Sequence, residues 1–152
     1  MLREHGIDHV KVEPLAQRLG VTKGSFYWHF KNRQDLLKSL PEFWARRQTD
    51  PVLAHVQAAP GGPIDKMRSI LEFIAREDPD QYDNAMRAWA QFDPEVAAAV
   101  AAIDDRRMAT ARWLFEEAGL SAPDAAFRAR LWYFYDVGEH VTRDTPDTVE
   151  ER

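Results

Sequence analysis

The chain has 152 residues, with 20 lysines and arginines against 25 aspartates and glutamates and a formal net charge of −5. It contains no cysteine, which excludes a disulfide framework and a cysteine-ligated zinc site. No run approaches the roughly 18 apolar residues of a membrane-spanning helix, and no signal-peptide pattern opens the sequence, so we expect a cytoplasmic protein.

The charge is divided unevenly along the chain. Residues 1–48 carry nine basic and five acidic residues, a net of +4, whereas the rest carries eleven and twenty, a net of −9. A basic segment joined to an acidic one suits a polyanionic partner at one end only. Chance clustering would give the same counts, so the charge becomes informative only together with a motif.

The amino-terminal segment has the pattern of short helices separated by turn signals. The pattern predicts a helix end at 2–5 stopped by Gly6, and then a loop over 7–11. A helix over 13–19 follows. Gly20 ends it, because glycine readily adopts the left-handed conformation that closes helices.

A second short helix follows this turn. Thr22 is placed to cap a helix over 23–30, and Asn32 is placed to cap the next one. Phe26 and Phe30 are four residues apart and share one helix face, which we assign to the core. The other side chains then project outward, as the recognition helix of a helix-turn-helix requires.

The remaining sequence predicts further helices and no strand. Apolar residues recur at helical spacing, and no window alternates convincingly with a period of two. The expected helices lie over 50–58, 64–77, 80–92, 94–118 and 123–142, with a polar tail over 144–152. The predicted fold class is therefore all-α, with a helix-turn-helix DNA-binding head and a helical body.

Two adjacent stretches carry a family signature, LAQRLGVTKGSFYWHF and then KNRQDLL. They resemble the TetR family of bacterial transcriptional regulators over about residues 2–40. More loosely, MRAWAQFDPEVAAAV and RRMATARWLFEEAGLS resemble the ligand-binding body of many members.

The resemblance implies a domain division and a mode of action. Residues 1–46 would be the DNA-binding domain, with a truncated first helix, and residues 47–152 an all-helical ligand-binding and dimerisation domain. A homodimer would bind a palindromic operator in double-stranded DNA. A small apolar molecule in the body would release the repressor from the DNA.

Two departures from the family pattern bear on DNA binding. Only Met1–His5 corresponds to the complete first helix of the family, so we expect Phe26 and Phe30 to be partly exposed. A shortened start site or an incompletely represented chain is one explanation. The alternative is a ligand-binding or protein-interaction module that has lost DNA binding. In addition, Lys11 and Glu13 stand where the family often carries threonine and arginine that bind phosphates.

Nine residues of the head are candidate DNA contacts. Lys23 can reach a guanine edge or a phosphate, Ser25 can meet a base edge, and Gly24 permits close approach. By the family resemblance, Tyr27 and His29 touch the sugar-phosphate backbone. The full set is Thr22, Lys23, Gly24, Ser25, Tyr27, Trp28, His29, Lys31 and Arg33. For the tryptophan of this set, packing on the preceding helix is the alternative.

The body is rich in aromatic residues, most of which must belong to its core. An apolar pocket among them would take a small hydrophobic or aromatic ligand, and we assign it to Met86, Trp89, Trp113 and Tyr133. The candidate polar groups of this pocket are Arg106, Asp136 and His140. Each of these three could instead lie on the surface, form an ion pair or contact a partner subunit.

The last predicted helix has two apolar faces. One face carries Phe127, Leu131, Phe134, Gly138 and Val141, and the other carries Ala125, Ala129 and Trp132. Two such faces predict burial against the same subunit on one side and against a partner on the other. We therefore expect a homodimer through the helices over 94–118 and 123–142.

Catalysis finds little support in the sequence, and an all-α enzyme is kept only as a third alternative. There is no cysteine nucleophile and no glycine-rich phosphate loop. His5 and His9 are four residues apart, but Gly6 interrupts the helix between them, which argues against a metal pair. We expect neither an enzyme nor a cofactor or metal site.

Overall fold

The computed structural model of the protein describes residues 1–77 and 82–143, and every regular element within these ranges is helical. The predicted all-α class is thus confirmed. The elements in chain order are α1 (Leu2–His5), the 3-10 helix η1 (Ile7–His9), α2 (Val12–Leu19), α3 (Lys23–His29), α4 (Arg33–Gln48), α5 (Asp50–Ala58), α6 (Pro63–Glu77), α7 (Asp83–Ala90), α8 (Pro94–Glu117) and α9 (Ala122–Arg143). None of the described helices combines the length and the apolar character that a membrane span needs.

Local capping fixes where several helices begin. The Thr22 hydroxyl accepts a hydrogen bond from the Ser25 N–H at 3.2 Å. The Asn32 side chain accepts one from the Asp35 N–H at 2.9 Å. These bonds satisfy backbone donors that the first turn of a helix leaves without a partner, so α3 and α4 begin where the sequence predicts.

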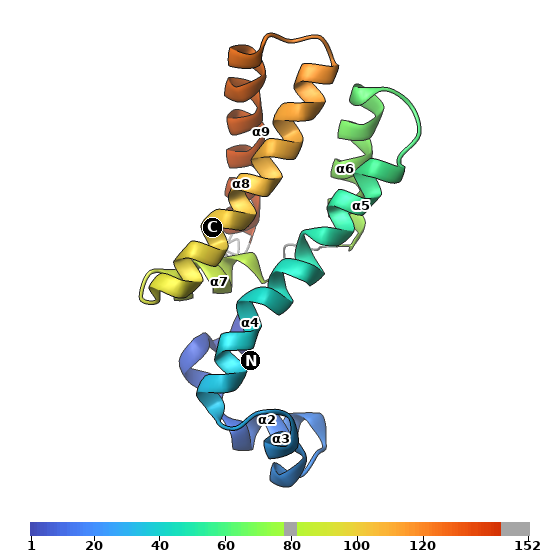
Figure 1. The fold of residues 1–152 in the computed structure, drawn as a ribbon. Helices are drawn as coiled ribbons and strands as arrows, with labels where there is room; N and C mark the ends of the chain where they lie inside the picture. The colour runs from blue at the N-terminus through green and yellow to red at the C-terminus, as the bar shows by residue number, and fades with distance from the viewer. Residues whose placement is uncertain (78–81, 144–152) are drawn as a thin grey trace, which may run out of the picture.

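The molecule is elongated, with the small amino-terminal helices at one end (Figure 1). Helix α4 leads from this end into the body, where α5 and α6 form one hairpin and α8 and α9 another. Helix α7 packs against α8 close to α1, between the two ends of the molecule. The head therefore joins the body through α4 and through the α1–α7 contact.

One hydrophobic core runs across the predicted boundary between head and body. Its buried members are Val10, Phe26, Leu36, Leu37, Trp44, Met86, Trp89, Val96, Val100 and Ile103. A second, smaller core joins α5, α6 and α8 through Val56, Ile70 and Leu114. The predicted boundary at residue 46 lies within the last turn of α4.

The structure corrects three expectations. Phe26 is only 7% exposed, so the expectation that it is partly exposed is wrong, whereas Phe30 is half-buried as expected. The predicted loop over 7–11 contains the short helix η1. The helix predicted over 80–92 is described from Asp83 and ends at Ala90. Its first two predicted residues, like the predicted tail over 144–152, lie outside the described residues.

Candidate nucleic-acid interface and body cavity

The turn between α2 and α3 orients α3 toward solvent. Gly20 adopts the left-handed conformation with φ of +66°, and the Val21 N–H returns to the Ala16 carbonyl at 3.0 Å. This αL ending satisfies carbonyls at the end of α2 and allows α3 to begin after three residues. Phe26 is the one buried residue of α3, so its remaining side chains point away from the core.

The outward residues of α3 form a continuous exposed surface at the end of the molecule far from the α5–α6 and α8–α9 hairpins (Figure 1). Lys23, Ser25, Tyr27 and His29 are exposed, and Trp28 is 84% exposed. Trp28 therefore does not pack on the preceding helix. A Cβ added at Gly24 would meet only the Thr22 hydroxyl at 3.6 Å, so the fold itself does not require glycine there.

The basic side chains beside this surface differ in what they contact. Lys23 forms an ion pair with Glu13 of α2. Its hydrogen bond to that carboxylate, helped by the opposite charge, raises the pKa of Lys23, and the same bond lowers the pKa of Glu13. Arg18 binds Glu4 through two hydrogen bonds of 2.5 and 2.9 Å, which lower the pKa of Glu4 to about 2.

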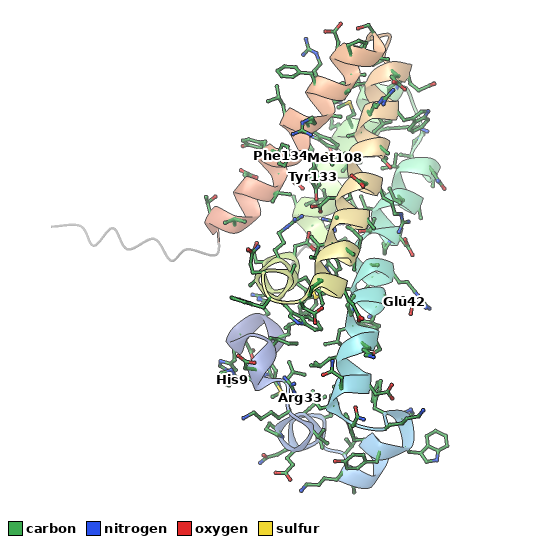
Figure 2. All side chains as sticks on the ribbon, turned by 60° about the vertical axis from the view of Figure 1, so that its left-hand side comes forward. His9, Arg33, Glu42, Met108, Tyr133 and Phe134 are labelled. Carbon is green, nitrogen blue, oxygen red and sulfur yellow. The ribbon has the colours of Figure 1, made fainter. Side chains whose placement is uncertain are left out.

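Arg33 is used inside the chain. It lies at the start of α4 and is half-buried (Figure 2). Its Nε donates to the Val10 carbonyl at 2.6 Å and its Nη2 to the Ile7 carbonyl at 2.8 Å. Lys31 is exposed, and only its backbone N–H is engaged, by Asp35 at 3.0 Å. Arg33 therefore holds η1 in place, whereas the Lys31 side chain has no such structural role within the described residues.

A pair of substitutions separates these roles. We expect Arg33→Met to lower the free energy of unfolding by about 2 kcal/mol, because charge-assisted hydrogen bonds to two half-buried carbonyls are lost. Lys31→Met should change stability by less than about 0.5 kcal/mol and reduce the salt dependence of DNA binding by about one phosphate. Urea denaturation and salt titration of DNA binding measure the two effects. The reverse pattern would make Arg33 the phosphate contact.

The four residues assigned to a ligand pocket do not gather in one cavity. Met86 and Trp89 are buried in the main core. Trp113 is partly exposed on α8, with the Lys66 ammonium 5.6 Å from the centre of its ring. Only Tyr133 lines the apolar cavity of the body.

That cavity has a volume of about 50 Å³ and is bounded by α5, α6, α8 and α9 and by Thr49 between α4 and α5. Its apolar lining consists of Val52, Leu53, Val56, Ile70, Ile74, Ala111 and Trp132. Its polar lining consists of Thr49, Arg107, Thr110, Tyr133 and Asp136. The four-residue spacing of the valines on α5 and of the isoleucines on α6 was the sequence signal that could have located these walls.

The polar groups expected at the pocket have different positions. Asp136 does line the cavity, whereas Arg106 forms an ion pair with Asp50 at 2.8 Å and is absent from the cavity lining. The side chain of His140 lies outside the described part of the structure. The sequence thus found two of the polar residues that line the cavity, Tyr133 and Asp136.

A buried polar network connects α4 with the body. The Asp83 carboxylate accepts a hydrogen bond from the Trp44 indole at 2.9 Å and pairs with Arg107 at 2.5 Å. Arg107 also donates to the Thr49 hydroxyl at 3.2 Å. Because Thr49 and Arg107 both line the cavity, one wall of the cavity is bonded to the helix that carries the head.

A second network lies between α7, α8 and α9. Arg87 binds Asp104 through two hydrogen bonds of 2.9 and 2.8 Å, and the Tyr133 hydroxyl donates to Asp104 at 2.6 Å. Burial opposes the charged form of Asp104, but the hydrogen bonds from Arg87 and Tyr133 outweigh it and lower the pKa of Asp104. Burial and the same contact with Asp104 raise the pKa of Tyr133. The tyrosine therefore stays protonated as a donor.

No cluster of metal-ligating side chains occurs within residues 1–77 and 82–143. His5 and His9, the pair considered in the sequence, have ring centres 5.5 Å apart. The Nδ1 atom of His9 lies 2.6 Å from the carbonyl oxygen of His5, so one ring nitrogen is already used by the backbone.

Known regulatory proteins share sequence similarity with this chain. Residues 1–40 match the family model of the bacterial regulatory proteins of the tetR family. The HTH-type transcriptional regulator AcrR of Shigella flexneri is 30% identical over 71 residues, which are 47% of this chain and 33% of that protein. No solved structure gives a significant match.

Tetracycline repressors are also among the relatives. The class G protein of Vibrio anguillarum is 42% identical over 48 residues, which are 32% of this chain and 23% of that protein. The class C protein of Escherichia coli is 28% identical over 154 aligned residues, covering 100% of this chain and 65% of that protein. The chain spans less than two thirds of the length of each of these three relatives.

The matched residues are those that build the turn and the exposed α3. The family model covers α1 to α3 and the first half of α4, which contain all nine candidate DNA contacts. The family consists of DNA-binding regulators and not of enzymes. Residues 1–40 of the chain are therefore similar to the amino-terminal domain of the tetR family of bacterial regulatory proteins.

Proposed function

We propose that the protein is a ligand-responsive repressor that binds a palindromic operator as a homodimer and is released from it by a small apolar molecule. Residues 1–46 are the DNA-binding domain in this proposal, and residues 47–152 are the ligand-binding and dimerisation domain. The relatives named as tetracycline repressors support repression and a response to a small molecule.

The observation that carries the DNA-binding part is the outward face of α3. Phe26 alone holds this helix to the core, and the polar and aromatic side chains around it are all exposed. A helix of this size fits the major groove with its amino-terminal residues against the base edges. Lys23 and Ser25 are therefore proposed to contact bases, and Tyr27, Trp28, His29 and Lys31 to contact the sugar-phosphate backbone. Thr22 caps the helix and is proposed to touch a phosphate, and Gly24 to allow close approach.

Exposed apolar residues on α9 support the homodimer. Phe127, Leu131, Phe134, Tyr135 and Val141 are all exposed on this helix, while Ala125 and Ala129 on its other side are buried. A contiguous apolar strip of this kind marks an association surface in a protein of ordinary composition. An isologous dimer through α8 and α9 would cover it and would present two heads to the two halves of a palindrome.

The body cavity supports the response to a ligand. Its volume of about 50 Å³ is well below the roughly 150 Å³ that accommodates benzene in an engineered cavity. A larger ligand would therefore have to separate the cavity walls. Thr49 and Arg107 belong to these walls and are bonded to each other, so separation would disturb the junction between α4 and α5. This is a direct route from ligand binding to the position of the head.

The test of DNA binding is fluorescence anisotropy with the DNA that flanks the protein's own gene, at two salt concentrations and with excess random DNA. We expect Lys23→Ala and Tyr27→Ala each to weaken binding by about 1–3 kcal/mol without unfolding the protein. Lys66→Ala, which removes an ammonium from the body, is the matched control and should bind as the parent does. Unchanged affinity in both head variants, or no binding by the folded parent, would contradict the proposal.

A further inference from the structure

A carboxylate occupies the surface that faces DNA in the proposed function. Glu13 lies in the first turn of α2 and pairs with Lys23, the first residue of α3, across the helix-turn-helix turn. Their side chains are 71% and 60% exposed, respectively, so a duplex docked on α3 would meet the lysine and the glutamate together.

The pair changes how Lys23 can act on DNA. Together the two side chains carry no net charge, so a paired Lys23 adds little attraction for an ordinary phosphate. An exposed ion pair also contributes little to the free energy of folding. Lys23 can therefore leave Glu13 when DNA offers a better hydrogen-bond acceptor. The N7 and O6 atoms of guanine in the major groove are two such acceptors for one lysine.

Other basic residues of the head are available for phosphates. Lys11 and Lys31 are exposed, and within the described residues no ion pair is formed by either. Arg18 is held by Glu4, and Arg33 donates to backbone carbonyls. General attraction to the DNA backbone can thus come from exposed basic side chains such as these two lysines, while Lys23 is restrained by Glu13.

From this geometry we infer that Glu13 is a specificity-determining residue, which suppresses binding to non-operator DNA by restraining Lys23. The inference rests on the proposed DNA-binding function. On a random sequence, Lys23 gains only a phosphate while the Glu13 charge remains beside that phosphate. On the operator, a guanine at the position that faces Lys23 replaces Glu13 as the acceptor, so the loss is recovered there and not on sequences that lack this guanine.

The variant E13Q tests this in the 152-residue chain. Two short duplexes are compared, one of random sequence and one enriched from a random pool by the parent protein. At about 50 mM salt we expect E13Q to bind the random duplex about 15-fold more tightly than the parent does, per engaged head. At about 200 mM salt the gain should fall to about four-fold. The reason is that one added phosphate contact steepens the dependence of log affinity on log salt concentration by about 0.9. On the enriched duplex the gain should be smaller, so the ratio of the two affinities falls.

Two further variants make the result decisive. E42Q removes a carboxylate that likewise forms an exposed pair, with Arg46, but lies on α4 outside the α2–α3 surface (Figure 2). It should leave both affinities unchanged. In a K23M background, E13Q should lose most of its effect. Matching thermal unfolding curves would show that E13Q and its parent fold alike.

Each contrary outcome has a distinct meaning. An equal gain from E42Q would show that net charge alone matters and would overturn the inference. An undiminished gain in the K23M background, or no gain from E13Q on random DNA, would also overturn it. If the parent enriches no sequence from the pool, the proposed function fails as well. An enriched sequence with an unchanged E13Q ratio defeats this inference alone.

Discussion

Asp83→Ala should lower the free energy of unfolding by about 3–5 kcal/mol, the cost that follows when one partner of a buried ion pair is removed. Asp83 is 6% exposed and Arg107 is 13% exposed, so little solvent is present to replace the carboxylate. The substitution would also leave the Trp44 indole N–H without its acceptor in the core. Urea denaturation at a fixed protein concentration measures the loss.

Two controls separate the buried pair from a general effect of losing an aspartate. Asp105→Ala removes an exposed carboxylate of α8 and should change stability by less than about 0.5 kcal/mol. The double variant D83L/R107M replaces both charges with apolar groups and should recover much of the stability, because neither charge then needs solvation. A loss below about 1 kcal/mol in Asp83→Ala would show that the network does not hold α4 to α7 and α8.

The second large effect concerns the apolar strip of α9. Phe134→Glu should weaken the proposed dimer by about 1,000-fold or more, because a buried carboxylate costs several kcal/mol and a two-fold interface would contain two of them. Phe134 is 53% exposed within one subunit, so the folded monomer should tolerate the change (Figure 2). Sedimentation at micromolar concentration should show a dimeric parent and a monomeric variant.

The matched control uses the same substitution elsewhere. Phe92 is 90% exposed between α7 and α8, and Phe92→Glu should leave the dimer intact. Operator binding should fall with Phe134→Glu because two linked heads bind more tightly than one. A parent that is monomeric at micromolar concentration, or a Phe134→Glu variant that stays dimeric, would contradict the assignment of this strip.

The features that the sequence predicts correctly are those that depend on residues close together in the chain. The start of α3, its end to within one residue, its inward Phe26 and its outward Tyr27 were predictable from the sequence. These features depend on a cap three residues away and on the spacing of side chains along one helix. The exposed strip on α9 was predictable for the same reason, because Leu131 and Phe134 lie on one face by their spacing alone.

What these local patterns contact depends on how the helices pack against one another. Whether Phe26 is covered depends on Val10, Leu36 and Leu37, which reach the same core from other elements. Arg33 has the spacing of a phosphate contact, yet carbonyls of the preceding turn take its guanidinium. No local signal distinguishes these two uses of an arginine.

An all-helical chain with a helix-turn-helix near its start follows from the residue pattern alone, because helical periodicity, caps and turn glycines act within a few residues. Helix packing separated Tyr133, which lines the cavity, from Met86, which is buried in the core, although the sequence analysis assigned both to one pocket. It alone joined Asp83 to Arg107, and Glu13 to Lys23 across a turn. Such partners are chosen by how whole helices pack, which periodicity along one helix does not encode.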